Sequence, residues 1–432
     1  MTVATKNISL LTSNARIQTP WIKVVIGTYT FGVYSRHNKN TKDNNGFYTT
    51  TSSVQYPNYV KSLNISKVNG QVNQYTLILD YPVTQTSDPN FFEKVLSSVS
   101  GTRKIVFSYG DMSQPNYIFK DEEAIITKVS SNFSLTGSVI TYTVYATSSA
   151  ALNKSKNCYF NGGYIKPSER IREIVSDLKY GLGDLFPAMN SGNLNSLIPS
   201  DDKVVYVNAK SNIAPIDYVS YLVSCMIPAS YTTAQTLSDT YVLTLHDDTV
   251  FDTEYINGLP LMGPYFKISR MSNKTASNDA YTIDIGFGNG NSTIVTQFSV
   301  NNDENYSLLY NYTTSQDTDE YKQVLDSNGE WKTVWSPTIT SKNSEYETRS
   351  EDIAWWSKVT QYPIKATITV QGLIRPALLT SYIRLNIIFV GGRKHISSGL
   401  YMVTKQEDKI DASGYRTTLN LTKISGDNNI TL

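Results

Sequence analysis

The chain has 432 residues, too many for one ordinary hydrophobic core, so we expect about two to four domains. Only 17% of the residues are charged and 31 are tyrosines, a balance that favours extended strands and argues against a helical bundle. The formal net charge of +1 argues against a dedicated nucleic-acid surface, because no overall positive field attracts phosphate groups.

The N-terminus lacks the basic start and apolar stretch of a secretory signal, and no segment approaches the roughly 20 apolar residues that span a bilayer. We therefore expect an intracellular product, in which disulfides are rare. Cys158 and Cys225 are expected to be free, buried thiols, and a disulfide or metal pair is the less favoured alternative.

Residues 1–155 are predicted to form a first β-domain. Residues 19–35 are expected to form one or two strands, and residues 74–82 alternate cleanly between apolar and polar types. The alternation predicts one strand face formed by Tyr75, Leu77, Leu79 and Tyr81.

A short helix is expected over residues 88–101. Asp88 can accept hydrogen bonds from first-turn amides, Pro89 suits the first helical position, and Gly101 ends the segment. Apolar side chains recur at helical spacing and predict a buried face formed by Phe92, Val95, Leu96 and Val99.

Residues 156–255 are predicted to form an inserted α+β domain, because the composition changes there. Residues 166–183 are expected to form a helix whose apolar face comprises Ile171, Ile174, Val175 and Leu178. Residues 214–227 are expected to form a second helix that buries Ile216, Val219, Leu222, Val223 and Met226. The strand 241–248 follows.

A second β-domain is expected from residues 256–310 together with residues 360–432, which hold the most regular strand pattern of the chain. Residues 311–359 are a polar and aromatic excursion or subdomain between these two parts. This excursion contains Trp331, Trp335, Trp355 and Trp356.

Two distant stretches share one strand pattern. The first comprises residues 103–111, 122–130 and 139–148, and the second comprises residues 383–392, 399–410 and 414–425. Each has an alternating strand, a polar turn, a second strand, a polar connection and a longer strand rich in Thr and Tyr. A duplicated β-unit suits a structural scaffold better than an enzyme.

The three histidines give weak signals for chemistry. His37 and His395 lie in polar turns and are expected to be solvated. His246 precedes Asp247 and Asp248 at a strand end, but adjacent residues on a strand point to opposite faces. We therefore expect a cluster that faces water, and not a metal site.

Two glycine-containing segments superficially resemble ligand loops. Residues 286–291 (GFGNGN) are followed by a strand where a phosphate-binding loop needs a helix, so a β-turn is predicted. Residues 326–330 (DSNGE) lack the remaining ligands of a calcium loop and are predicted to form a tight turn.

Carboxylate pairs such as Asp201–Asp202 and Glu122–Glu123 are compatible with a glycosidase only in the weakest sense, because so many acidic residues place some side by side. The tryptophans of residues 311–359 could stack on sugar rings, but such residues more often anchor a subdomain or a subunit contact. We predict no enzymatic activity, no catalytic, cofactor-binding or metal-binding residues, and no cofactor.

The order of the elements resembles that of baseplate hub proteins of tailed phages, a family shared with contractile injection systems and the type VI secretion spike. Residues 56–150, with QYTLILDYP, DPNFFEKVLSSV, RKIVFSYGD and ITYTVYATS, resemble the first tube-like domain of the family. Residues 360–427 resemble the second such domain, and its recurring motifs are similar to Phe389–Gly392, Ser398–Val403 and Gly414–Leu421. The central helices match the inserted domain of the family in placement.

The resemblance implies a mainly β fold with an inserted α+β domain and two tube-like antiparallel β-barrel or sandwich domains per chain. It implies a homotrimer whose six similar domains form a pseudo-sixfold ring between the tail tube protein and the central spike or tail lysozyme.

Further implied partners are other baseplate proteins and the tape measure protein, while DNA passes only through the channel. The implied location is the virion tail baseplate, assembled in the host cytoplasm. A tail receptor- or carbohydrate-binding protein is the alternative function, and a tail glycan hydrolase is less favoured.

Overall fold

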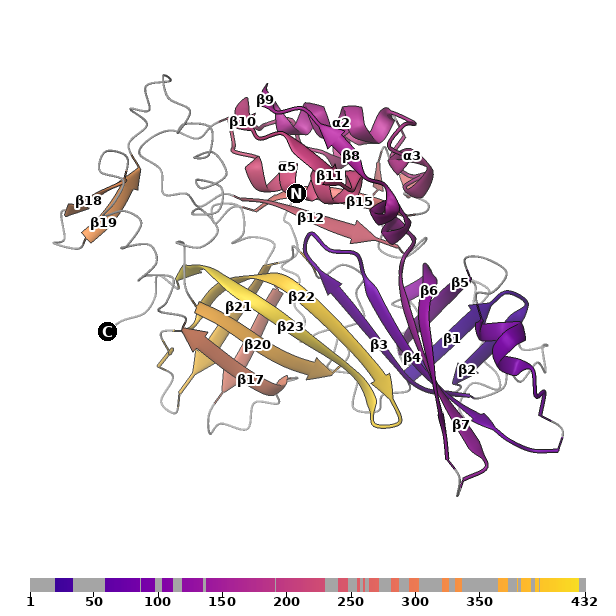
Figure 1. Cartoon of the computed structure of the whole chain (residues 1–432). Helices are drawn as coiled ribbons and strands as arrows, with labels where there is room; N and C mark the ends of the chain where they lie inside the picture. The colour runs from indigo at the N-terminus through magenta and orange to yellow at the C-terminus, as the bar shows by residue number, and fades with distance from the viewer. Residues whose placement is uncertain are drawn as a thin grey trace.

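The computed structural model shows two β-modules side by side and a helical domain above them (Figure 1). It describes residues 20–33, 59–85, 87–97, 103–111, 119–134, 137–190, 192–229, 240–247, 255–256, 259–260, 264–271, 281–286, 295–302, 321–325, 331–335, 364–371, 379, 382–389, 393–395 and 397–426. Thirteen strands from both modules belong to one hydrogen-bonded sheet, so the chain has a mainly β fold, as predicted.

The first β-module is formed by the strands that precede the inserted domain. Its strands are β1 (Pro20–Ile26), β2 (Tyr29–Val33), β3 (Val60–Val68), β4 (Gln74–Pro82), β5 (Lys104–Asp111), β6 (Phe119–Phe133) and β7 (Val139–Ser148). Strand β4 buries Tyr75, Leu77, Leu79 and Tyr81, as its alternation predicts. These side chains belong to a core to which every strand of the module contributes.

The helix expected over residues 88–101 is only a single π-helical turn, η2 (Phe92–Leu96). Asp88 does accept the N–H of Asn90 at 2.9 Å, but Phe92 is 37% exposed and Phe91 is buried in its place. The ring of Phe91 stacks on that of Tyr81 with centroids 4.1 Å apart, so aromatic packing against β4 decides the local turn. Val99 lies outside the described residues.

The inserted domain joins β7 to the second module. Its elements are η3 (Ser149–Ser155), β8 (Cys158–Phe160), β9 (Gly163–Ile165), α2 (Pro167–Ser176), α3 (Leu182–Leu185), α4 (Leu194–Leu197), β10 (Val205–Val207), β11 (Lys210–Ile213), α5 (Pro215–Cys225), β12 (Thr240–His246), β13 (Tyr255–Ile256), β14 (Leu259–Pro260) and β15 (Tyr265–Met271). The apolar residues expected on the second helix are all buried on or just after α5.

Two sequence expectations for this domain need correction. Leu178 is 82% exposed, because α2 ends at Ser176 and the chain is extended at Asp177. Strand β15, expected in the second β-domain, pairs with β12, and its Phe266 and Ile268 lie in the inserted domain's core. Alternation identifies a strand but does not say which sheet it joins, which explains the second error.

The second β-module consists of β16 (Tyr281–Gly286), β17 (Val295–Asn302), β20 (Ile364–Gln371), β21 (Tyr382–Ile388), β22 (Gly399–Asp411) and β23 (Gly414–Gly426). A separate antiparallel pair, β18 (Tyr321–Leu325) and β19 (Trp331–Trp335), flanks the predicted turn at residues 326–330. The module has its own buried core, drawn from β16 and β20–β23.

The two modules have the same strand order. In space the first runs β3-β4-β7-β6-β5-β1, and the second runs β17-β20-β23-β22-β21-β16. In each module, the three strands that come last in the chain form an antiparallel meander: β5, β6 and β7 in the first, and β21, β22 and β23 in the second. This meander is the duplicated unit that the sequence pattern predicts. The outermost pair differs, since β1 is antiparallel to β5 whereas β16 is parallel to β21.

Two irregularities of the ladders also coincide, whereas the shift of β5 against β6 after Phe107 and the shift of β22 against β23 after Leu400 have no counterpart among the described residues of the other module. The register of β6 against β7 shifts at Thr127, and that of β22 against β23 shifts at Thr404. At both bulges the threonine hydroxyl donates to a carbonyl of the partner strand at 3.1 Å, Thr127 to Tyr145 and Thr404 to Asn420. Strands β3 and β17 carry matching bulges at Lys61 and Thr296. Bulges tend to be kept among related structures, so the matching bulges establish which residues of the two modules are equivalent.

Candidate functional site: the joint between the two modules

The two β-modules are joined by direct strand pairing. The first half of β22 pairs with β21, whereas Lys405–Asp411 pairs antiparallel with β3, from Val68 to Ser62. The change of neighbour occurs at the Thr404 bulge, which bends the strand where it leaves one module and enters the other. The side chain of Ile410 from β22 is consequently buried in the core of the first module.

A buried ion pair lies at the end of this joint. Lys67 of β3 contacts Glu122 of β6, and the two side chains are 6% and 0% exposed. Tyr109 of β5 donates a hydrogen bond to the second carboxylate oxygen of Glu122 at 3.1 Å. The carboxylate thus keeps a partner on each oxygen, which is what a charge needs when it is removed from water.

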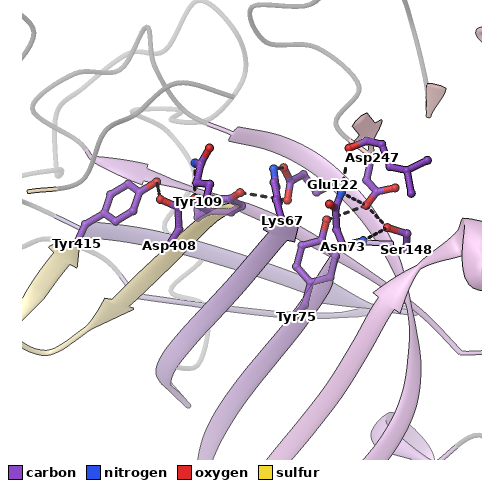
Figure 2. A network of polar contacts seen from close by, with 11 residues as sticks. Lys67, Asn73, Tyr75, Tyr109, Glu122, Ser148, Asp247, Asp408 and Tyr415 are labelled. Carbon is purple, nitrogen blue, oxygen red and sulfur yellow. Dashed lines mark hydrogen bonds and ion pairs between the residues drawn. The ribbon is translucent and has the colours of Figure 1, made fainter. Parts of the chain in front are cut away.

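Asp408 of β22 forms a second buried cluster, contributed by the second module (Figure 2). Its Oδ1 accepts from Thr417 at 2.6 Å and from Tyr415 at 3.1 Å, and its Oδ2 accepts from Gln406 at 2.7 Å. Burial raises the pKa of Asp408 to about 6, although these hydrogen bonds and the charge of Lys67 oppose the shift. Burial and the neighbouring Asp408 raise the pKa of Tyr415 well above its usual value, so the phenol remains a donor.

Asp247 brings the inserted domain into the same network (Figure 2). Its Oδ2 accepts from Asn73 at 2.8 Å, from Tyr75 at 3.0 Å and from Ser148 at 2.5 Å. Burial raises the pKa of Asp247 to about 6 against the effect of the Ser148 and Asn73 hydrogen bonds. A carboxylate that follows β12 is therefore held by three donors of the first module.

Backbone contacts reinforce this attachment. The N–H of Gly70, in the turn between β3 and β4, donates to the carbonyl of Leu243 in β12 at 2.7 Å. Gly70 has a φ of 73°, a left-handed conformation that glycine adopts at little cost, and a Cβ there would lie 3.3 Å from the hydroxyl of Ser220. The β3–β4 turn is thus shaped to fit against the inserted domain.

The geometry of the network suits a structural joint better than a reaction centre. The three carboxyl groups, of Glu122, Asp247 and Asp408, are each at most 1% exposed, so no substrate reaches them from solvent. Within the part of the chain that the structure describes, no group of three or more His, Cys, Asp or Glu side chains could hold a metal ion. What the arrangement does is hold three parts of the chain in one geometry.

The expectation that His246 belongs to a water-facing cluster is wrong. Its ring is half-buried and stacks on Tyr265, with centroids 4.5 Å apart, and it shares a hydrogen bond with Thr244 at 3.1 Å. Burial, together with the charges of Lys67 and Lys267, lowers the pKa of His246 to about 3, so the imidazole is neutral. The neighbouring Asp247 points to the opposite side, as strand geometry requires, and Asp248 lies outside the described residues.

Of the other two histidines, only His395 belongs to the described residues. The Nδ1 of His395 accepts the N–H of Ser397 at 3.2 Å inside a half-buried turn. His37 lies outside the described residues.

The carboxylate pairs do not converge on a common point. Glu122 is buried, whereas Glu123 lies near the surface beside Lys104. Asp201 accepts from Tyr241 at 2.8 Å and from Arg270 at 2.6 Å, in a different direction from its neighbour. Asp202 accepts the N–H of Ser168 at 2.9 Å, at the start of α2. Each acid therefore has its own structural partner.

The remaining candidates can be placed only in part. Neither Cys158 nor Cys225 forms a disulfide, and Cys225 is buried whereas Cys158 is half-buried. Trp331 and Trp335 lie at the two ends of β19, and Trp355 and Trp356 lie outside the described residues. The glycine-rich segment 286–291 begins at the last residue of β16 and otherwise lies outside the described residues. Among the described helices, none is long and apolar enough to cross a membrane.

Sequence reasoning missed Lys67, Glu122 and Asp247 as parts of one site. A signal for Lys67 was present, because it continues the buried face of β3 after Leu63 and Ile65. A lysine at a buried position of an alternating strand requires a buried acid, and Glu122 has the same parity as the buried Ala124 and Ile126 on β6. Asp247 had no comparable signal, because its partners depend on how the inserted domain docks.

No protein-family model and no curated protein matches the chain. Solved structures are similar to it. The tail protein from Neisseria meningitidis MC58 is 9% identical, with 95% of this chain and 98% of that chain covered and a TM-score of 0.46. The 43 kDa tail protein of prophage MuSo2 from Shewanella oneidensis is 9% identical, with 95% and 100% covered and a TM-score of 0.45.

The c3393 protein of E. coli, a component of the type VI secretion system, is also similar. It is 9% identical, with 87% of this chain and 77% of that chain covered and a TM-score of 0.40.

Proposed function

We propose that this chain is a structural subunit of a phage tail baseplate hub, and that three copies form a ring that joins the tail tube to the central spike. The observation that carries this proposal is the duplication of one β-module, with the same strand order in both copies and with two bulges at equivalent positions, in β3 and β17 and in β6 and β22. The first module comprises residues 20–148, and the inserted domain extends through β15 before the second module begins.

Threefold symmetry would explain why one chain contains two copies of the module. Closed homo-oligomers repeat one interface around an axis, so three copies of a two-module chain present six similar modules in a threefold ring. Such a ring can meet a sixfold tail tube on one side and a threefold spike on the other. A chain with one module could match only one of these partners.

The joint described above supports this use of the duplication. Six modules form a ring only if each module contacts the next in a similar way, and β22 and β3 make one such contact inside the chain. The buried network holds that contact and the inserted domain in one geometry. A part that transmits load between a tube and a spike benefits from such fixed joints.

The proposed partners follow from this placement. They are two further copies of the chain, the tail tube protein, the spike or tail lysozyme, neighbouring baseplate proteins and the tape measure protein. DNA passes only through the channel, the subunit is not an enzyme, and its site is the virion baseplate after assembly in the host cytoplasm.

The mass and the shape of the purified chain test the proposal. We expect light scattering to give three times the mass of one chain, and negative-stain images to show a threefold ring with a central pore. A monomer at every accessible concentration, or an oligomer without a pore, would contradict the proposal. Turnover of cell-wall glycan by the chain, abolished by removal of one carboxylate, would instead indicate an enzyme.

A further inference from the structure

Within the described part of the chain, the second half of β6 has a strand partner on one side only. Strand β5 pairs with β6 no further than Ile125, and the backbone N–H of Ile126 then donates to Arg103. From Lys128 to Phe133, β7 is the one neighbour of β6 among the residues that the structure describes. Five of these six residues are exposed, and Val129 is half-buried. This outer edge, Lys128–Phe133, is called here the β6 edge.

The corresponding stretch of the second module is not an edge. Counting from the matching bulges at Thr127 and Thr404, the β6 edge corresponds to residues 405–410 of β22. That stretch pairs with β3 of the first module and forms the joint. The same structural position is therefore covered in one module and, among the residues that the structure describes, open in the other.

The strand that would cover it also has an equivalent. Counting from the bulges at Lys61 and Thr296, residues 62–67 of β3 correspond to residues 297–302 of β17. Strand β17 ends the strand order of the sheet, with β20 beside it. In Figure 1, β17 lies at one margin of the molecule and the far end of the β6–β7 pair projects at another, so one chain cannot bring them together.

We propose that the β6 edge of one chain pairs antiparallel with β17 of a second copy, in the register that the joint shows inside the chain. This inference deepens the proposed function and rests on it. In the joint, Lys409 lies opposite Asn64 and Ile410 lies opposite Leu63. The equivalent positions place Asn132 opposite Ser299, and Phe133 opposite Phe298, across the subunit boundary.

The apolar residues of the two edges fit this register. Ile410 and Leu63 are buried in the joint, at 1% and 0% exposure. Their equivalents are Phe133, which is 63% exposed, and Phe298, which is half-buried. An isolated chain thus leaves a large aromatic side chain in water at the position where the joint buries an isoleucine, and pairing with a second copy would cover it.

The charges of the edges also favour pairing. Proteins usually protect exposed edge strands with charged residues, which oppose pairing with another chain. Strand β17 has no charged residue, and Lys128 is the one charge on the β6 edge. These edges lack the usual protection, as expected of strands that a partner covers. The contact runs head to tail, so its repetition about a threefold axis would give the closed ring of the proposed function.

Disulfide cross-linking tests the register. Opposed residues of an antiparallel pair have Cα atoms about 4.5–5.5 Å apart, a separation that a disulfide spans. In a Cys158→Ser background, the full-length chain with Asn132→Cys and Ser299→Cys should give covalent dimers and trimers under mild oxidation. The matched pair Asn132→Cys with Val300→Cys should not, because a shift of one residue turns the side chain to the opposite face.

An intrachain pair controls for the chemistry. Lys409→Cys with Asn64→Cys occupies the equivalent positions of the joint and should form a disulfide within one chain, without covalent oligomers. A trimeric ring in which the 132–299 pair gives no covalent oligomer, while the 409–64 pair forms, overturns this inference and leaves the proposed function standing. A chain that stays monomeric overturns both.

A second variant tests the apolar contact without relying on thiols. Phe133→Ala should weaken association about 10- to 100-fold, the effect of losing one buried Phe side chain. Leu178→Ala, which truncates a still more exposed side chain of the inserted domain, should leave association unchanged. Equal association of the Phe133→Ala variant and the unaltered chain would overturn the proposed contact.

Discussion

The two β-modules have the same strand order and two matching bulges, but their buried charged residues differ. Glu122 lies five positions before the Thr127 bulge, and the position five before Thr404 is Gly399, which has no side chain to pair. Lys67 lies six positions after the Lys61 bulge, and the position six after Thr296 is Asn302. Strand order and bulges are thus the repeated part, whereas the buried charges belong to the one joint that lies within the chain.

The difference shows what each kind of contact requires. A joint within a chain forms once, during folding, so it can include a buried ion pair whose geometry the rest of the fold secures. An edge strand that pairs with another copy only after folding is in water beforehand. It therefore carries few charged side chains, which would be costly to remove from water when the copies pair. Four predictions test this comparison, and they start with the largest expected effect.

Glu122→Gln should lower the free energy of unfolding by about 3–5 kcal/mol, because it removes the carboxylate that contacts the buried ammonium group of Lys67. Urea denaturation followed by circular dichroism measures the effect. The neighbouring Glu123→Gln is the matched control and should cost less than about 1 kcal/mol, since its pair with Lys104 is exposed. Equal costs for the two variants would show that the network does not hold the joint.

Ile410→Ala should destabilise the chain by about 2–5 kcal/mol, because it leaves a cavity in the core of the first module. The equivalent Phe133→Ala should change the unfolding free energy of the separate chain by only about 0.5 kcal/mol, since the ring is exposed there. The unfolding midpoints in urea compare the two directly. A large loss from Phe133→Ala in a monomer would contradict the assignment of an open edge.

The pH dependence of stability should reveal the two buried acids. The pKa values of Asp247 and Asp408 are about 6 in the folded chain and near 3.8 when unfolded, so the folded state binds more protons between about pH 4 and pH 6. The contribution of each acid is fully present below about pH 4 and is lost as the pH rises through about 6, by up to about 3 kcal/mol for each acid.

The variants Asp247→Asn and Asp408→Asn isolate this effect. Each should flatten the fall in unfolding free energy between about pH 4 and pH 6, because the amide does not titrate. Thermal denaturation at a series of pH values provides the measurement. An unchanged pH profile in both variants would contradict the raised pKa values.

The smallest effect concerns the matching bulges. Thr127→Val and Thr404→Val each remove one hydroxyl hydrogen bond to the partner strand and should each cost about 1 kcal/mol. Because the positions are equivalent, the two costs should agree within a few tenths of a kcal/mol, as measured by urea denaturation. A clear inequality would show that the bulges resemble each other in geometry only.

The sequence predicted the parts of this molecule that depend on local pattern. Strand β4 and helix α5 bury the residues expected of them, because alternation and helical spacing report directly on a buried face. The meanders of the two modules were also visible as a repeated pattern of strands and turns.

Elements whose structure depends on distant partners were predicted less well. The turn at residues 92–96 is set by the stacking of Phe91 on Tyr81, and β15 joins a sheet that its own residues do not specify. The network was missed for the same reason, since Asp247 meets its donors only after the inserted domain docks on the first module.

The joint also has a consequence for assembly. Each association step costs roughly 4–15 kcal/mol in lost translational and rotational freedom. Linking the modules in pairs removes that entropic cost from every second boundary of the proposed ring, so fewer encounters between free molecules are needed before it closes. The boundaries between chains are then the places where the proposed ring would open under load.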